Sequence, residues 1–330
     1  MSFSEIIGQE RPVRILQSSL KKGDVSHAYL FYGPEGIGKR LTALNFAKAM
    51  NCLSLANDSC GECIHCKKFD NENFPDFSVV EPADGNIKIE IIRELQRKIS
   101  YRPYEGKFKV IFIHGAEEMT LGAANSFLKT LEEPPGATVF ILVCHNFNLL
   151  LPTIISRCQK IQFNLIPVKT IKNILIKEKQ ITPEDAHLMA SYSQGRLGKA
   201  LEMGIRDIIK MRNEILNLMQ SASFDEMDLI FKKNKVWSSD KGKKNIEIIL
   251  ASILNIVRDM AVLKGTRNEK LIVNLDVKDQ LISLIRVSNI NQLIFLFYSI
   301  EETIRHFKRN INAQLLLDTL MIKMCSVFEK

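Results

Sequence analysis

The residues whose types and spacing point most clearly to chemistry form a glycine-rich loop, Gly33-Pro-Glu-Gly-Ile-Gly-Lys39. The loop has the form G-x-x-x-x-G-K and lies between an apolar run typical of a buried strand and a segment typical of a helix. In that context backbone N–H groups surround a phosphate, the helix start adds positive potential, and Lys39 reaches the terminal phosphates. The candidate nucleotide-binding residues are Gly33, Gly36, Gly38, Lys39 and Arg40.

Two departures from the usual pattern argue against hydrolysis by this loop alone. The position after the lysine, where a Ser or Thr hydroxyl would bind Mg²⁺, holds Arg40. The positions after the third expected strand, where a hydrolysing enzyme carries acids that hold magnesium and polarise water, are His114 and Gly115. Glu117 and Glu118 come a turn too late, and we expect them to be solvated acids at a helix start.

Four of the seven cysteines cluster in the form C-x7-C-x2-C-x2-C. No basic stretch leads into an apolar run at the N-terminus, so the cluster indicates a metal site before it indicates disulfides. Four thiolates around one tetrahedral ion favour a structural zinc over a catalytic one. His65 is a competing ligand, and redox chemistry of the C-x2-C pairs is the weaker alternative. The predicted ligands are Cys52, Cys60, Cys63 and Cys66.

Composition sets broader limits. A chain of 330 residues with 46% hydrophobic and 25% charged residues is typical of a globular protein with two or three domains. The net charge of +8 permits contact with nucleic acid or an acidic partner without indicating either. Polar residues interrupt the longest apolar run, 246–263, so we expect a cytoplasmic protein. The dense basic run 241–244 is interpreted as a solvated approach to a helix.

The first half of the chain alternates strand-like and helix-like segments. Strands are expected at 27–32, 77–80, 109–113, 139–143 and 160–163, and helices at 40–50, 87–99 and 122–131. Strands and helices in alternation predict an α/β fold with a parallel sheet flanked by helices.

After Pro167 every periodic segment is helical. The expected helices are 170–178, 182–192, 197–203, 246–263, 271–287, 291–307 and 315–328. The economical division is a P-loop domain at 1–166 with a zinc-binding insert at 52–66, a small helical domain at 167–206, and an all-α domain at 207–330.

A lone arginine follows the fourth expected strand, in the segment Ser156-Arg157-Cys158. No acid lies near it in the sequence, so it is either a surface residue or an arginine finger that reaches the triphosphate of a neighbouring subunit. Such a finger contributes ~10³–10⁵ in rate.

Taken together, these segments resemble the bacterial clamp-loader branch of the AAA+ ATPases. The segments that carry the resemblance are Ile7-Gly-Gln-Glu10, the loop 33–39, the four-cysteine insert, Leu128-Lys-Thr-Leu-Glu-Glu-Pro-Pro135, Ser156-Arg-Cys158 and Ser193-Gln-Gly-Arg-Leu-Gly198. The resemblance is looser in the C-terminal helices, where Asn310-Ile-Asn-Ala-Gln-Leu-Leu316 is similar to the collar of these proteins.

Within that branch the chain departs from the motor subunits. Motor subunits carry an intact magnesium loop, an Asp-Glu pair after the third strand and a polar sensor after the fourth, where this chain has Arg40, His114-Gly115 and Cys144-His145. The lid arginine that senses the γ-phosphate is replaced by Gly198, with Arg196 close by. The chain is therefore similar to a non-hydrolysing subunit of the branch.

The resemblance implies an AAA+ P-loop domain, a helical lid and an all-α collar that holds subunits together. It implies a hetero-pentamer with motor (gamma/tau) and delta subunits, which loads the β sliding clamp onto primer–template DNA for DNA polymerase III, a nucleotidyltransferase. This chain would be a rigid stator without polymerase activity and with little or no ATPase activity. Arg157 would be its catalytic residue, acting in a neighbour's site, and DNA contacts would be to backbone phosphates.

The implied cofactor is a structural Zn²⁺, whereas occupation of the loop by ATP or ADP stays open.

Two alternative functions remain at this point. One is a motor subunit or other active AAA+ ATPase that uses Glu117 or Glu118. The other is a zinc-dependent nucleic-acid-binding protein with a vestigial loop.

Overall fold

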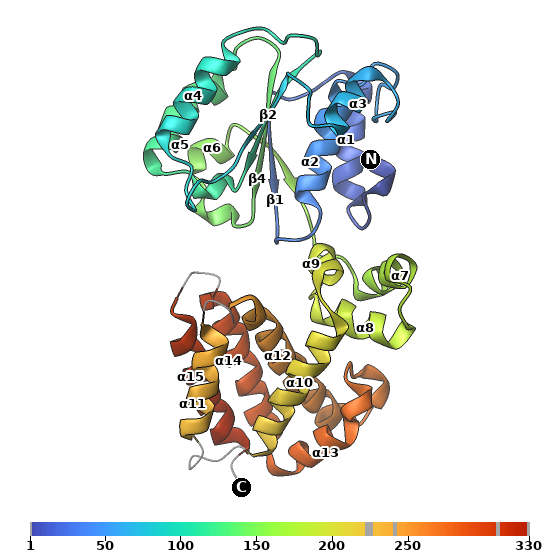
Figure 1. Cartoon of the computed structure of the whole chain (residues 1–330), viewed down its shortest axis with the longest axis vertical. Helices are drawn as coiled ribbons and strands as arrows, with labels where there is room; N and C mark the ends of the chain where they lie inside the picture. Colours follow the sequence, from blue (N-terminus) through green and yellow to red (C-terminus); the bar gives the residue numbers. More distant parts are fainter. Residues whose placement is uncertain (1, 222–226, 240–242, 308–310, 329–330) are drawn as a thin grey trace. The chain divides into compact units, whose positions relative to one another are not determined.

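The computed structural model describes residues 2–221, 227–239, 243–307 and 311–328 (Figure 1). Residues 241 and 242 of the basic run, and Asn310 of the collar-like segment, lie outside this description. The chain divides into two compact units, Met1–Pro167 with Gly195–Gly198, and Val168–Gln194 with Lys199–Lys330.

A five-stranded parallel sheet forms the centre of the first unit. Its strands are β1 (Ala28–Tyr32), β2 (Phe77–Val80), β3 (Lys109–His114), β4 (Thr138–Cys144) and β5 (Gln159–Gln162), in the spatial order β2-β3-β4-β1-β5. The central strand β4 is buried along its whole length, which explains its uninterrupted apolar sequence. The predicted α/β fold with a parallel sheet is confirmed.

Helices cover both faces of this sheet, and each face has its own hydrophobic core (Figure 1). The helices on one side are α1 (Glu10–Lys22), α2 (Lys39–Met50) and α3 (Ile64–Asp70), and those on the other are α4 (Ile89–Ile99), α5 (Leu121–Glu132) and α6 (Pro152–Ile155). Short 3₁₀ turns are η1 (Phe3–Glu5), η2 (Ala116–Glu118) and η3 (Phe147–Leu149). The strands therefore end in loops that lie between two helical layers.

The second unit is helical in its described residues. Its elements are α7 (Val168–Lys179), α8 (Pro183–Tyr192), α10 (Ile205–Gln220), α11 (Met227–Ser238), α12 (Lys243–Thr266), η5 (Glu269–Leu271), η6 (Leu275–Val277), α13 (Lys278–Val287), α14 (Ile290–Phe307) and α15 (Ala313–Phe328), and α9 (Leu197–Glu202) begins at the boundary between the units. One hydrophobic core joins α10 to α15. Because α8 packs with α10 and α12 in the same unit, the separate lid at 167–206 and collar at 207–330 stay predictions.

One predicted helix begins later than the sequence indicated. Helical periodicity suggested residues 271–287, but α13 begins at Lys278. The carboxylate of Asp259, which is fully buried in α12, accepts the backbone N–H groups of Val273 and Asn274 and the side-chain amide of Asn274 at 2.8–3.1 Å. These N–H groups are therefore held in the short non-helical stretch between η5 and η6, because a buried carboxylate requires donors.

No single described helix is long and apolar enough to cross a membrane. One pair, Leu275–Val287 with Ile290–Phe307, meets the length and composition test only when joined, and it is bent by 112°.

We expect Asp259→Ala to lower the free energy of unfolding of the second unit by about 3 kcal/mol, because it leaves buried N–H groups unsatisfied. Urea unfolding followed by the fluorescence of Trp237 measures this, since Trp237 is the single tryptophan and is buried in the same core. Asp279→Ala, at an exposed acid of α13, is the matched control and should change the free energy by less than about 0.5 kcal/mol. Equal effects of the two changes would contradict the role given to Asp259.

Candidate functional site

The glycine-rich loop connects the end of β1 to the start of α2. Gly33, Gly36 and Gly38 have positive φ angles of 142°, 74° and 95°. A Cβ atom on Gly33 would lie 2.3 Å from the carbonyl oxygen of Phe163, so a larger residue does not fit there without a backbone shift. The loop thus has a backbone that depends on glycine, as a phosphate-binding turn before a helix requires.

Lys39 is buried, and its ammonium group is bonded to the loop itself. Nζ donates to the carbonyl oxygen of Gly33 at 2.5 Å and to that of Pro34, and it lies 3.1 Å from Nδ1 of His145. Burial lowers the pKa of Lys39 to about 8. A phosphate would therefore compete with the carbonyl groups of the loop for this ammonium group.

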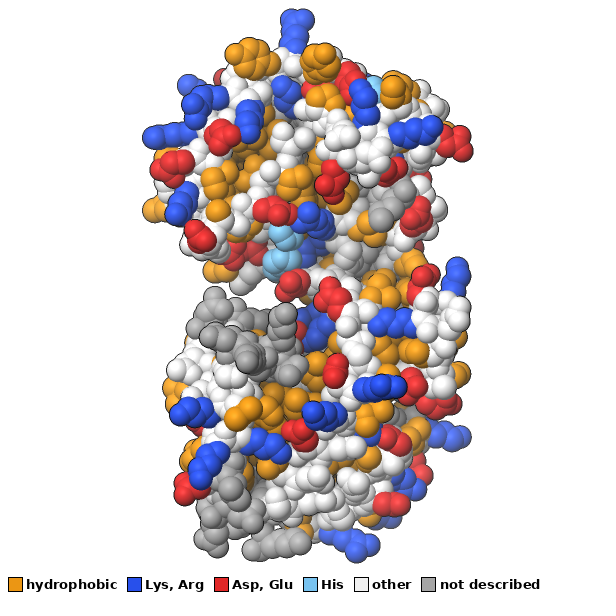
Figure 2. Space-filling model, in the orientation of Figure 1, with side chains coloured by type: hydrophobic (Ala, Val, Ile, Leu, Met, Phe, Trp, Pro, Cys, Tyr) orange, Lys and Arg blue, Asp and Glu red, His pale blue; other side chains and the backbone are white. Residues whose placement is uncertain are grey.

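The positions that would hold magnesium carry cationic or neutral side chains. Arg40 forms an ion pair with Glu81 and lies 5.8 Å from the ring centroid of Phe112. The rings of His114 and His145 meet edge-on at 5.7 Å, and burial lowers the pKa of both, so both are neutral at pH 7. Histidine, basic and acidic side chains gather on the face of the first unit drawn in Figure 2.

Glu117 is placed differently from the sequence expectation. Instead of being a solvated acid, Glu117 accepts the backbone N–H groups of His145 at 2.6 Å and Asn146 at 3.1 Å through Oε1, while its Oε2 is buried and has no hydrogen-bond partner among the described residues. The left-handed backbone of Gly115 starts the turn η2, which brings Glu117 to the loop after β4. Glu118 is exposed, as expected. Glu117 therefore joins the ends of β3 and β4 and has a structural role.

Gly198 and Arg196, which stand where related proteins carry the lid arginine that senses the γ-phosphate, also lie near the glycine-rich loop. The N–H group of Gly198 donates to the carbonyl oxygen of Gly36 at 2.8 Å, and a Cβ atom on Gly198 would lie 3.2 Å from that oxygen. Arg196 is buried, and its charge contributes to the lowered pKa of Lys39. Gly198 thus contacts the loop through its backbone, and Arg196 keeps a positive charge near it.

The four clustered cysteines are brought together, and they are positioned to bind a metal ion. Their sulfur atoms all lie within 4.8 Å of one another. Backbone N–H groups point at the sulfur atoms, among them Cys60 N to Cys52 Sγ at 3.4 Å, Cys63 N to Cys60 Sγ at 3.2 Å and Cys66 N to Cys63 Sγ at 3.4 Å. The N–H groups of Cys63 and Glu62 lower the pKa of Cys60 to about 6, which favours the thiolate that metals bind.

His65, the competing ligand, faces away from this group of sulfur atoms. Its Nδ1 lies 2.8 Å from the carbonyl oxygen of Asn51, and its ring meets Phe74 edge-on at 5.2 Å between centroids. The ligand set that the structure assembles is therefore Cys52, Cys60, Cys63 and Cys66.

Arg157 follows α6 and has an acidic partner that the sequence did not reveal. Its Nε donates to Oε1 of Glu132 at 2.8 Å, its Nη2 donates to the same oxygen, and its Nη1 donates to the carbonyl oxygen of Thr153 at 2.8 Å. The side chain of Arg157 remains 33% exposed. Glu132 ends α5, in the segment 128–135 that the sequence had singled out, 25 positions before Arg157.

Arg157 and the glycine-rich loop lie at opposite ends of the sheet. β1 and β5 are parallel, with Tyr29 paired to Gln159 and Tyr32 to Gln162. Arg157 therefore lies just before the start of β1 in register, whereas the loop follows its end. The five residues of β1 span roughly 17 Å, which is longer than an arginine side chain. Arg157 does not reach the loop of its own chain.

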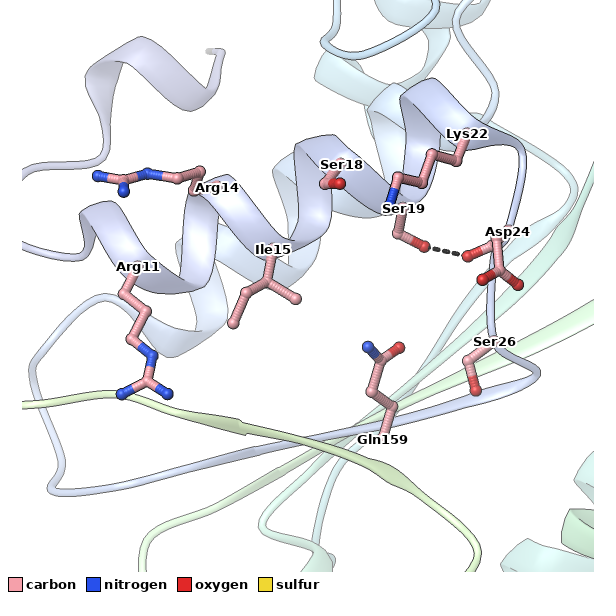
Figure 3. Close-up of a pocket in the computed structure, with 9 residues that line it drawn as sticks. All are labelled: Arg11, Arg14, Ile15, Ser18, Ser19, Lys22, Asp24, Ser26 and Gln159. Atoms are coloured by element: carbon pink, nitrogen blue, oxygen red, sulfur yellow. Dashed lines mark hydrogen bonds between the residues drawn. The ribbon is translucent and has the colours of Figure 1, made fainter.

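A separate concave surface lies between α1 and the start of β5 (Figure 3). Its cavity of about 610 Å³ is lined by the cations Arg11, Arg14 and Lys22 and by Gln159. Within the described part of the chain these three cations form no ion pair, and the bond between Ser19 and the backbone of Asp24 closes one end. This groove contains none of the candidate residues identified from the sequence.

The sequence is similar to known subunits of a DNA polymerase. A family model described as DNA polymerase III, delta subunit, matches residues 8–167. The DNA polymerase III subunit delta' of Bacillus subtilis (strain 168) is 32% identical over 321 residues, 96% of each chain. DNA polymerase III subunit tau of the same strain is 35% identical over 66% of this chain but only 39% of that protein. A solved gamma-subunit-related protein from Thermotoga maritima aligns with 96% of this chain and 100% of that chain, at 19% identity and a TM-score of 0.43.

We expect the reduced chain to bind about one divalent ion through its four thiolates. Titration with Co²⁺ should produce a thiolate-to-cobalt absorption band with a stoichiometry near one. Cys66→Ala should weaken binding strongly, because it removes a buried ligand.

The matched control is His65→Gln, which changes a neighbouring side chain that faces away from the sulfur atoms and should keep the band. Loss of the band in His65→Gln with retention in Cys66→Ala would overturn the assigned ligand set.

Proposed function

Since the chain belongs to the family of DNA polymerase III delta' subunits, we propose that it is a clamp-loader subunit that does not hydrolyse ATP at its own loop. It acts as a stator and supplies Arg157 to the ATPase site of a neighbouring motor subunit. The observation that supports this proposal most strongly is the distance between Arg157 and the loop of the same chain, across the length of β1. An arginine at that end of the sheet has to serve another chain if it acts on a triphosphate.

The surroundings of the glycine-rich loop support the absence of hydrolysis. Arg40 stands at the position where a hydroxyl would bind Mg²⁺, and His114 stands at the usual acid position. Glu117 contacts the loop after β4: its Oε1 accepts two backbone N–H groups there, and its Oε2 is buried. The similarity to tau keeps an ATP-hydrolysing motor subunit as the alternative, but these contacts disfavour it.

The proposed partners follow from the family. They are the gamma/tau motor subunits and the delta subunit in a hetero-pentamer, with the β sliding clamp and primer–template DNA reached through the complex. The helical residues 207–330 would form the collar that joins the subunits, and DNA would be contacted through backbone phosphates, without sequence readout.

The proposed ion at the cysteine cluster is a structural Zn²⁺. Four cysteine ligands without an open position suit zinc in a folding role. Cys52 follows the end of α2 and Cys66 lies in α3, so the ion would tie the insert to the helix that starts at the glycine-rich loop.

We expect Arg157→Ala to slow hydrolysis at the adjacent motor site by about 10³-fold, because the developing charge on the transferred phosphoryl group loses its arginine. The loss of this one site's share from the steady-state ATPase rate of a loader reconstituted with motor and delta subunits, the clamp and primed DNA measures this effect. Analytical gel filtration establishes that the variant still enters the complex.

Lys39→Ala in this chain is the control, and it should leave the ATPase rate unchanged. An unchanged ATPase rate in Arg157→Ala would contradict the role of Arg157 as an arginine finger. A large loss in Lys39→Ala would instead indicate that the loop of this chain hydrolyses ATP.

A further inference from the structure

We propose that Glu132 is a positioning residue for the neighbour's ATPase site, because it holds the guanidinium group of Arg157 in the orientation that a triphosphate meets. This inference rests on the proposed function. It adds a second residue of this chain to that site, one that acts through Arg157 and does not touch the nucleotide.

The contacts of Arg157 fix its guanidinium group from two sides. Nε and Nη2 both donate to Oε1 of Glu132, and Nη1 donates to the carbonyl oxygen of Thr153. Thr153 belongs to α6 and Glu132 to α5, so two separate elements determine where the group lies. A planar group bound at three nitrogen atoms has little rotational freedom.

This arrangement leaves part of the group available to a ligand. Arginine has five N–H donors: Nε and Nη2 each use one on Glu132, and Nη1 uses its two on Thr153 and, at 3.4 Å, on Ser156 Oγ. The side chain is 33% exposed, so the second N–H of Nη2 can reach solvent or another chain. Glu132 thus binds the guanidinium group along the edge formed by Nε and Nη2, and the group stays partly exposed to solvent.

The location of Glu132 is unfavourable for its helix, and the ion pair offsets this. Glu132 is the last residue of α5, where the negative end of the helix dipole disfavours an acid. The segment continues through Glu133 to Pro134-Pro135, which stops the helix. An acid is therefore kept at a helix end that favours cations, next to the arginine that it binds.

Pre-orientation explains how this contact would raise the rate. A free arginine side chain populates many rotamers, and part of that rotamer entropy is lost when it binds a phosphoryl group. Glu132 imposes that order before the neighbour's nucleotide arrives. Misplacement of a catalytic group by about 1 Å can lower the rate about 10²-fold.

The test compares loaders reconstituted with Glu132→Ala, Glu132→Gln, Arg157→Ala and the double variant Glu132→Ala/Arg157→Ala. Glu132→Ala should lower the rate at the adjacent motor site about 10- to 100-fold, seen as loss of that one site's share of the loader's kcat, with little change in the KM for ATP, since the motor subunit still binds its nucleotide. Glu132→Gln, which keeps the acceptor oxygen, should restore part of the rate. In the Arg157→Ala background, Glu132→Ala should have no further effect.

Glu133→Ala is the matched control. Glu133 is an adjacent exposed acid that, among the described residues, forms no side-chain hydrogen bond or ion pair, so the rate should not change. Gel filtration and metal content establish that each variant folds and assembles.

The contrary outcomes distinguish failure of the Glu132 inference from failure of the proposed function. A rate in Glu132→Ala equal to or above that of the unmodified loader overturns the positioning role, and an increase would mean that Glu132 restrains the arginine. A further loss in the double variant would assign Glu132 to the fold alone and also overturn the inference. No loss in Arg157→Ala would overturn the proposed function itself.

Discussion

The parallel sheet imposes the constraint on which the rest of the structure depends. In a parallel sheet all strands begin at one end and finish at the other, so β1 delivers the glycine-rich loop to one end. The residues before β5, with Arg157 among them, lie at the opposite end. The glycine-rich loop and Arg157 therefore cannot meet within one chain.

The contacts around the glycine-rich loop give it a structural role that needs no hydrolysis. Lys39 is bonded to the carbonyl groups of the loop, and Gly198 donates to Gly36. Glu117 connects the ends of β3 and β4 through backbone N–H groups. These bonds join the loop, two strand ends and the start of α9.

Local patterns predicted much of the fold, whereas contacts between distant residues could not be predicted from them. Apolar runs located the inner strands β1, β3 and β4 to within one residue, because strands inside a parallel sheet are apolar on both faces. The edge strands β2 and β5 were also located to within one residue, although β5 is exposed except at Ile161. The cysteine spacing likewise identified a cluster whose members lie close in sequence. Asp259 binds Val273, 14 positions later, and so moves the start of α13; Glu132 binds Arg157, 25 positions later. A periodic pattern in the sequence does not indicate contacts between residues so far apart.

The most direct test of the central claim is the binding of a transition-state analogue to the reconstituted loader. ADP with aluminium fluoride binds tightly only where the charge on the transferred group is stabilised, whereas ADP alone does not depend on the finger. We predict that Arg157→Ala removes one tight analogue site per complex and leaves ADP binding unchanged. An unchanged number and affinity of analogue sites would contradict the claim that this chain completes the site of its neighbour.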